Sequence, residues 1–180
     1  MNYYALGLLA FFNLFSQSPP YYKFENEIIE QHRKETLQPI GLNYSIIGGG
    51  NQDGIKIVQL GVSKIGPGSI EEGRRLIVFL VENLIARYNT HQKIRPHLNN
   101  YPYTAKNVIY RIWYNCPKGG FWVIQDKQHP EKEIALIDMY KGKIEYDINF
   151  INGTTSRLRT VHTETYEEAK KIVMEEQNHK

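Results

Sequence analysis

Apolar and polar residues alternate most regularly in the second half of the chain. From 143 to 150 every second residue is apolar, and the residues between them are charged or polar. The stretch 108–114 has the same period of two, with aromatic and aliphatic residues on one side. A period of two predicts β-strands that bury one face. Continuous apolar runs at 121–124 and 134–140, and the stretch 157–161, predict further strands.

Helical spacing and capping signals mark three other regions. Apolar residues recur every three or four positions after Pro20, and we expect this helix to end at Pro39. A capping box at 69–72 opens a helix that continues to about residue 90. This helix is apolar on nearly all sides, which is typical of a helix buried at the centre of a domain. A second capping box at 165–168 predicts a closing helix.

The order of these elements predicts an α+β fold. Two strands, 42–47 and 55–63, follow the first helix and are joined by a glycine-rich hairpin loop at 48–54. Further strands follow the central helix 69–90. We therefore expect an antiparallel sheet of roughly five to six strands, because strands joined by hairpins and placed between helices favour this arrangement. The long central helix is expected to cover one face of the sheet, with one helix before it and one at the C-terminus.

The residues Asn152–Gly153 mark a second hairpin, whose register decides where its arginines point. A two-residue loop would place Arg157 beside Ile148 on the core face. A three-residue loop, 152–154, instead places Leu158 opposite Ile148. We expect the second register, because a shift of one residue moves every side chain to the other face and would bury an arginine.

The N-terminus carries a long apolar run, from 3 to 15. Small and polar residues follow it at 16–18, and then two prolines, which is the order of an export signal. The run is shorter than the roughly 20 residues that a spanning helix needs. Against a signal, no Lys or Arg precedes Lys23. We expect residues 1–18 to be an export signal and 19–180 to be a single α+β domain. A buried core element and an uncleaved membrane anchor are the alternatives for the run.

Composition limits the class of protein. The chain has 180 residues, of which 41% are hydrophobic, and this is enough for a core of its own. Its 22 basic and 19 acidic residues give a net charge of +3, which indicates a mixed surface and not the excess of a nucleic-acid-binding protein. The single cysteine, Cys116, excludes an internal disulfide.

No motif in the chain reaches the specificity of a catalytic, metal or cofactor site. The triple glycine at 48–50 lacks the Gly-Lys-Ser/Thr ending and the following helix of a phosphate loop. Glu71 and Glu72 lie in the first turn of the central helix and would repel an anion there. The six histidines are scattered, and Cys116 alone cannot build a structural zinc site. We expect no catalytic residue, no bound metal and no cofactor.

The loop 93–107 is the segment richest in side chains that commonly bind ligands. Two prolines stiffen it, which lowers the cost of holding polar groups in one arrangement. Its candidate binding residues are Arg95, His97, Tyr101, Tyr103 and Lys106. One interpretation is a small enzyme with a site around this loop, since loops on rigid scaffolds often carry function. The other is that the loop crosses the sheet edge and its tyrosines fill the core.

Tryptophan and arginine side chains gather on two of the predicted strands. Alternation places Arg111 and Trp113 on the same face of 108–114. The expected hairpin register places Arg157 and Arg159 together, away from the core. Trp and Arg are the residue types enriched at the centres of protein interfaces. If the two strands are neighbours, these four side chains form one partner-binding surface; the alternative is that Trp113 lies under the closing helix and the arginines are solvated edge charges.

Residues 94–114 read IRPHLNNYPYTAKNVIYRIWY, and the helix before them contains EEGRRLIVFLVENLI. Together with the triple-glycine hairpin, this stretch resembles a group of small uncharacterised exported proteins of bacteria, with chlamydia-like and legionella-like organisms among them. The group shares an Arg-Pro-x-Leu-x-x-Tyr-Pro-x-Thr-Ala-Lys-Asn core, which here occupies 95–107. The resemblance spans roughly residues 42–114 and implies a bacterial, exported address. It implies no activity, ligand or catalytic residue.

These observations favour an exported domain, periplasmic or secreted, that binds a partner and has no catalytic role. We expect the partner to be another protein, and we expect no nucleic acid. A membrane would be contacted only through the N-terminal segment, if that segment is not cleaved. The alternative function is the small enzyme with a site at 93–107. The alternative locations are the membrane, through an N-terminal anchor, and the cytoplasm.

Overall fold

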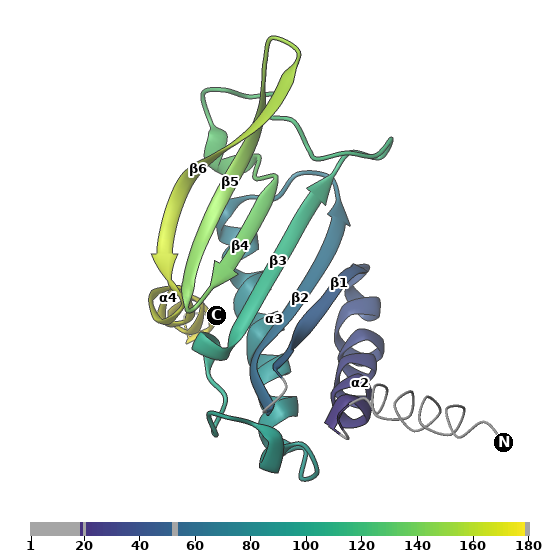
Figure 1. Ribbon diagram of the computed structural model, residues 1–180. Coiled ribbons are helices and arrows are strands. Elements are labelled where there is room, and N and C mark those ends of the chain that lie inside the picture. The colour runs from purple at the N-terminus through teal and green to yellow at the C-terminus, as the bar shows by residue number, and fades with distance from the viewer. Residues whose placement is uncertain (1–18, 20, 52–53, 179–180) are drawn as a thin grey trace, which may run out of the picture.

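The computed structural model describes residues 19, 21–51 and 54–178 of the chain. These residues form a six-stranded sheet, in the order β1-β2-β3-β4-β5-β6, and three α-helices (Figure 1). In chain order the elements are α2 (Tyr21–His32), β1 (Asn43–Asn51), β2 (Gly54–Ile65), α3 (Ile70–Thr90), β3 (Val108–Asn115), β4 (Leu136–Tyr140), β5 (Lys143–Asn152), β6 (Thr155–Thr165) and α4 (Tyr166–Asn178). The predicted export signal at 1–18 lies outside the described residues.

All neighbouring strands of the sheet are antiparallel except β2 and β3. These two strands are parallel because α3 carries the chain from the end of β2 back to the opposite end of the sheet, where β3 begins beside the start of β2. Parallel neighbours need such a crossover. The predicted α+β class and the mostly antiparallel sheet are confirmed. The single parallel pair is the difference from the predicted sheet.

The three helices pack on the same side of the sheet. Strand register places Tyr110, Ile137 and Tyr146 on one face. Gly73 of α3 lies against the side chains of Ile137 and Tyr146, and His32 at the end of α2 contacts the Tyr110 hydroxyl. Figure 1 shows α4 beside α3. The prediction that the long central helix alone covers this face is therefore not confirmed, because α2 and α4 pack on the same side of the sheet as α3.

The central helix begins and ends where the sequence predicts. The hydroxyl of Ser69 accepts a hydrogen bond from the backbone N–H of Glu72, at 3.2 Å, which caps the first turn. Ile77, Leu80 and Leu84 on the inner side of α3 are fully buried. Burial of these aliphatic side chains against the sheet is the main source of stability for the helix.

The triple glycine lies within a strand, so the predicted loop at 48–54 is wrong at its start. β1 continues to Asn51, and Gly48 is paired with Gln59 of β2. A Cβ added at Gly48 would lie 3.5 Å from the Gln59 side chain. The side chain of Gln59 therefore occupies the space beside Gly48 within the sheet.

The hairpin between β5 and β6 has a different register from the predicted one. The residues Gly153–Thr154 form a two-residue loop, and Ile148 is paired with Arg159. Leu158 consequently faces away from Ile148. The reason is visible in Figure 1, where the hairpin projects beyond the helices. Arg159 on the helix side therefore remains exposed, and its guanidinium lies 5.7 Å from the centre of the Phe150 ring.

The apolar run at 121–124 forms a loop and not the predicted strand. Phe121 makes a single bridge with Asn115, and the N–H of Trp122 donates to the Tyr114 carbonyl at 2.7 Å. The indole N–H of Trp122 donates to Glu133 at 2.9 Å. These contacts hold the loop in place, and of the run only Ile124 is buried, so its apolar residues do not indicate a strand.

Candidate binding surface

One face of the sheet is turned away from the helices, and we call it the open face. Figure 1 views the molecule from this side and shows α3 behind the strands. Strand register places these side chains on the open face: Gln59, Ser63, Ile109, Arg111, Trp113, Leu136, Asp138, Tyr140, Lys143, Glu145, Asp147, Leu158 and Thr160. No helix of the described residues covers this face, so its exposed side chains are available for a partner.

Two ion pairs lie on the open face, one between neighbouring strands and one within a single strand. Arg111 of β3 donates through Nε to Asp138 Oδ2 of β4, at 3.1 Å. On β5, Lys143 Nζ lies 2.6 Å from Glu145 Oε1. The second oxygen of Asp138, Oδ1, is buried and has no hydrogen-bond partner among the described residues. A buried carboxylate oxygen without a donor is costly, so this position favours an added donor group.

Asp147 is the carboxylate of the open face that has no ion pair in the described part of the chain. It is buried, and its Oδ1 accepts a hydrogen bond from the Thr160 hydroxyl at 2.6 Å. Burial raises the pKa of Asp147 above its ordinary value, and the negative charges of Glu145 and Asp138 raise it further, against the lowering effect of the Thr160 hydrogen bond. A positive charge beside Asp147 would stabilise its ionised form.

Trp113 lies in the same row of the open face as Asp147. Trp113 is paired with Leu136, and Leu136 is paired with Asp147 on the next strand. On its other side Trp113 is paired with Ser63, which is small. The tryptophan is half-buried, and Tyr140 further along the face is 49% exposed. Both aromatic side chains are therefore accessible in part to a partner.

The predicted single surface of Arg111, Trp113, Arg157 and Arg159 is wrong, because the structure does not bring the first two residues together with the last two. β3 and β6 are not neighbours, since β4 and β5 lie between them. The observed hairpin register also places Arg157 and Arg159 on the helix side, opposite Phe150 and Ile148. Arg111 and Trp113 do share the open face, as alternation along β3 predicts.

The candidate residues of the loop 93–107 lie in different environments. Tyr103 is buried, and its hydroxyl donates to the Ile55 carbonyl at 2.6 Å. The guanidinium of Arg95 lies 5.5 Å from the centre of the exposed Tyr101 ring. Tyr103 therefore supports the core, whereas the Arg95 and Tyr101 pair belongs to the outer surface of the loop.

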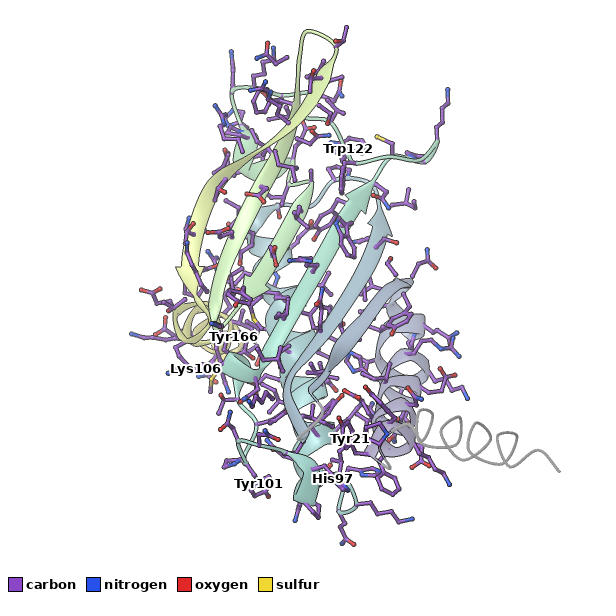
Figure 2. The ribbon with its side chains drawn as sticks, in the orientation of Figure 1. Tyr21, His97, Tyr101, Lys106, Trp122 and Tyr166 are labelled. Carbon is purple, nitrogen blue, oxygen red and sulfur yellow. The ribbon has the colours of Figure 1, made fainter. Side chains whose placement is uncertain are left out.

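The two remaining candidates of this loop are further apart. Figure 2 shows His97 beside Tyr21, and their ring centres are 5.6 Å apart. Lys106 lies near Tyr166, at the end of the sheet where α4 begins (Figure 2). The five candidates of the loop thus do not converge on one site.

Asp138 and Asp147 are the site residues that sequence reasoning missed. The alternation in 143–150 already placed Asp147 on the polar side of its strand. Asp138 is the one charged residue in the apolar run 134–140, which was a weaker signal. Neither residue could be joined to Trp113 from the sequence, because the order of strands in the sheet is a long-range property.

The described residues contain no group of three His, Cys, Asp or Glu side chains arranged to hold a metal ion. The thiol of Cys116 lies 3.4 Å from the Phe121 carbonyl oxygen. None of the helices in this part of the chain is long and apolar enough to span a bilayer.

Comparison with known proteins gives no match. A scan against protein-family models, a search of curated proteins and a search of solved structures each find nothing similar to this chain.

Proposed function

We propose that the chain is an exported, non-catalytic domain that binds a protein partner on the open face. The observation that carries the proposal is the row formed by the half-buried Trp113 and the buried Asp147, which has no ion pair among the described residues. Tryptophan side chains at interfaces often contribute a large part of the binding energy. A buried carboxylate in the same row, separated from the ring by Leu136, adds a defined charge that a partner can recognise.

The charges of the open face indicate a basic partner. Its carboxylates are Asp138, Glu145 and Asp147, whereas its cations are Arg111 and Lys143. Three carboxylates and two cations give the face one excess negative charge. Because each cation is paired with another carboxylate, the excess charge is that of Asp147. An Arg or Lys side chain of the partner would pair with this carboxylate and lie over the indole ring, a contact worth about 0.5–2 kcal/mol.

The export part of the proposal is supported by the sequence alone. The apolar run 3–15, followed by small residues and two prolines, has the order of an export signal. The resemblance of residues 42–114 to small exported bacterial proteins supports the same address. A partner on the outer side of the inner membrane or outside the cell would then meet the open face.

The alternative of a small enzyme at the loop 93–107 receives less support. An active site brings its titratable groups together in a concave pocket. Arg95, His97 and Lys106 instead lie at separate places on the molecule.

A random peptide library displayed on phage tests the binding function. Selection on the purified chain is expected to enrich peptides with Arg or Lys, and Asp147→Asn should weaken a selected peptide about tenfold, since it removes the unpaired charge. Glu175→Gln on α4 removes an exposed carboxylate far from the open face and should leave the affinity within about twofold. Selected peptides without basic residues, or equal losses in the two variants, would contradict the proposal.

A further inference from the structure

Basic and tyrosine side chains are concentrated at the end of the molecule where α2 begins, and we call this region the basic end. It is defined by five exposed residues, two at the start of α2 and three in the segment after α3: Tyr22, Lys23, Lys93, Arg95 and Tyr101. Figure 2 shows His97 and Tyr101 at this end and Trp122 at the opposite end. The basic end does not depend on the proposed function of the open face.

Ring contacts join the two parts of the basic end. The centre of the Phe24 ring on α2 lies 5.9 Å from the centre of the His91 ring, and the Tyr21 and His97 rings are 5.6 Å apart. The ammonium group of Lys93 lies 5.7 Å from the centre of the Phe24 ring. The start of α2 and the segment after α3 are distant in the sequence, and these contacts bring them to one surface.

The basic end has an excess of positive charge. Segments 21–27 and 91–107 together contain four Lys or Arg residues, two Glu residues and no Asp. Glu25 is buried, so the exposed carboxylate of these two segments is that of Glu27. Glu27 lies 3.7 Å from His91 and forms no ion pair with a lysine or arginine in the described part of the chain. The cations are therefore free to meet an anionic surface.

Aromatic rings, and not carboxylates, hold two of these cations. The guanidinium of Arg95 lies 5.5 Å from the centre of the Tyr101 ring, and its Nε donates to the Asn89 carbonyl at 2.8 Å. Lys93 lies near the Phe24 ring in the same way. Among the described residues, neither cation has a carboxylate partner. A ring orients a cation without neutralising its charge, so both keep their attraction for an anion.

Two exposed tyrosines accompany the cations. Tyr22 is 38% exposed and Tyr101 is 53% exposed. Tyrosine is enriched where the hydrocarbon of a bilayer meets its headgroups, because its ring is apolar and its hydroxyl is polar. Exposed tyrosines beside lysine and arginine therefore match the chemistry of a phospholipid surface.

The N-terminal apolar run joins the domain at this same end. The described chain begins at Pro19, and α2 begins two residues later. The run 3–15 precedes Pro19 in the sequence and has the order of an export signal. While such a signal is in the membrane, the basic end is the part of the domain closest to it. An apolar segment and a basic patch are two signals that reinforce one another in membrane attachment.

From these features we infer that the basic end binds a membrane surface that contains anionic phospholipids. Lys23, Lys93 and Arg95 would lie among the lipid phosphates, and each cation near such a surface strengthens binding about fivefold. Tyr22 and Tyr101 would lie at the level of the headgroups. The open face is not part of this contact and stays available to its own partner.

Binding of the full chain to lipid vesicles tests the inference. Vesicles of phosphatidylcholine and phosphatidylglycerol are compared with vesicles of phosphatidylcholine alone. The ratio of the two affinities is the readout, because the apolar run 3–15 can contribute to both. We expect a ratio of about 100, from about fivefold for each of three cations, and we expect it to decrease as salt is added.

Two pairs of substitutions separate the basic end from general charge. Lys93→Gln with Arg95→Gln should lower the ratio about tenfold or more, whereas Lys93→Arg with Arg95→Lys should keep most of it. Lys118→Gln with Lys127→Gln removes two exposed lysines of the 116–134 loop and should change the ratio by less than about twofold. Equal losses in the two glutamine pairs would overturn the inference. Equal affinity of the parent chain for polyglutamate and for the mixed vesicles would also overturn it, since the partner would then be an acidic polypeptide.

Fluorescence quenching by brominated phospholipids tests the orientation on the membrane. The chain has two tryptophans, Trp113 and Trp122, and Trp122 lies at the end opposite to the basic end (Figure 2). Tyr101→Trp adds a third at the basic end. We expect the variant to lose more fluorescence than the parent on vesicles that contain the brominated lipid. Equal fractional quenching of the two proteins would show that another surface meets the membrane and would overturn the inference.

Discussion

His32 is a titratable residue placed entirely inside the protein. Its side chain is fully buried, its Nε2 lies 3.3 Å from the Tyr110 hydroxyl, and its Nδ1 has no partner among the described residues. Burial, followed by the positive charge of Arg87, lowers the pKa of His32 from 6.5 to about 4. The folded protein therefore holds His32 neutral at pH values where an unfolded chain would protonate it.

We expect the free energy of unfolding to decrease as the pH is lowered from 6.5 towards 4. Between these values the unfolded chain binds a proton at His32 and the folded chain does not, so acidification favours unfolding. The contribution of His32 is fully present above pH 6.5, and its loss amounts to about 3 kcal/mol by pH 4, since one pKa unit corresponds to about 1.4 kcal/mol. Urea titrations at several pH values measure this slope.

The variant His32→Gln removes this titration and is the reference for the slope. Glu25 acts in the opposite direction, because burial raises its pKa and its protonation favours the folded state. Comparison of the variant with the parent protein at each pH isolates the part that belongs to His32. The same slope in both proteins would refute the lowered pKa.

Leu80 is an aliphatic residue whose burial the sequence predicts. It lies in the unbroken apolar block of α3 and is fully buried, as predicted. Leu80→Ala is expected to reduce the free energy of unfolding by about 2–5 kcal/mol, because it leaves a cavity in the core. Leu158→Ala, at a side chain that is 43% exposed, should stay within about ±0.5 kcal/mol. Similar effects of the two substitutions, measured by urea unfolding, would argue against this placement of α3.

Among the elements, the connection from β2 to α3 is fixed by a close approach of backbone and ring. Gly68 exchanges backbone hydrogen bonds with Ile134, and a Cβ at Gly68 would overlap the ring of the buried Tyr114. Gly68→Ala should therefore reduce the free energy of unfolding by about 1–3 kcal/mol. Gly48→Ala, where a Cβ would make only ordinary contacts, should have an effect within about ±0.5 kcal/mol. A Gly68→Ala protein as stable as its parent would contradict the contact.

The elements with strong local signals were predictable from the sequence. Alternation placed the buried side of β3 correctly, and the capping boxes located the starts of α3 and α4. The β5–β6 register was not predictable, because it depends on where the hairpin leaves the cover of the helices and on the irregularity between Tyr146 and Asp147. For the candidate site, the alternation along β3 alone predicted that Arg111 and Trp113 lie on the same face. Its carboxylates on β4 and β5 required the strand order, which no local pattern contains.

The role of the N-terminal segment 1–18 as an export signal stays a prediction. A chain that begins at Pro19 is expected to unfold cooperatively, with a free energy of unfolding close to that of the full chain, if 1–18 is a removable signal. Chemical denaturation of the two chains provides the comparison. Loss of a cooperative transition in the shorter chain would show that the segment is part of the core.

On the scale of the whole molecule, the protein is asymmetric. Its helices pack on one side of the sheet, and the other side presents aromatic residues with an excess of negative charge. The helices pack on the other face of the sheet, so the exposed side chains of the open face can contact a partner without loss of the helix–sheet packing.

The most direct test of the open face is the affinity of a selected basic peptide for two variants, each of which lacks one aromatic side chain. Trp113→Ala removes a half-buried ring of the open face, and Phe79→Ala removes a 45% exposed ring on α3. We expect Trp113→Ala to weaken binding by about tenfold or more, equivalent to about 1.4 kcal/mol, and Phe79→Ala to leave it within about twofold. Fluorescence anisotropy of the labelled peptide, at a temperature where both variants are folded, gives the two values. Unchanged binding by Trp113→Ala, or an equal loss in Phe79→Ala, would contradict the open face as the binding surface.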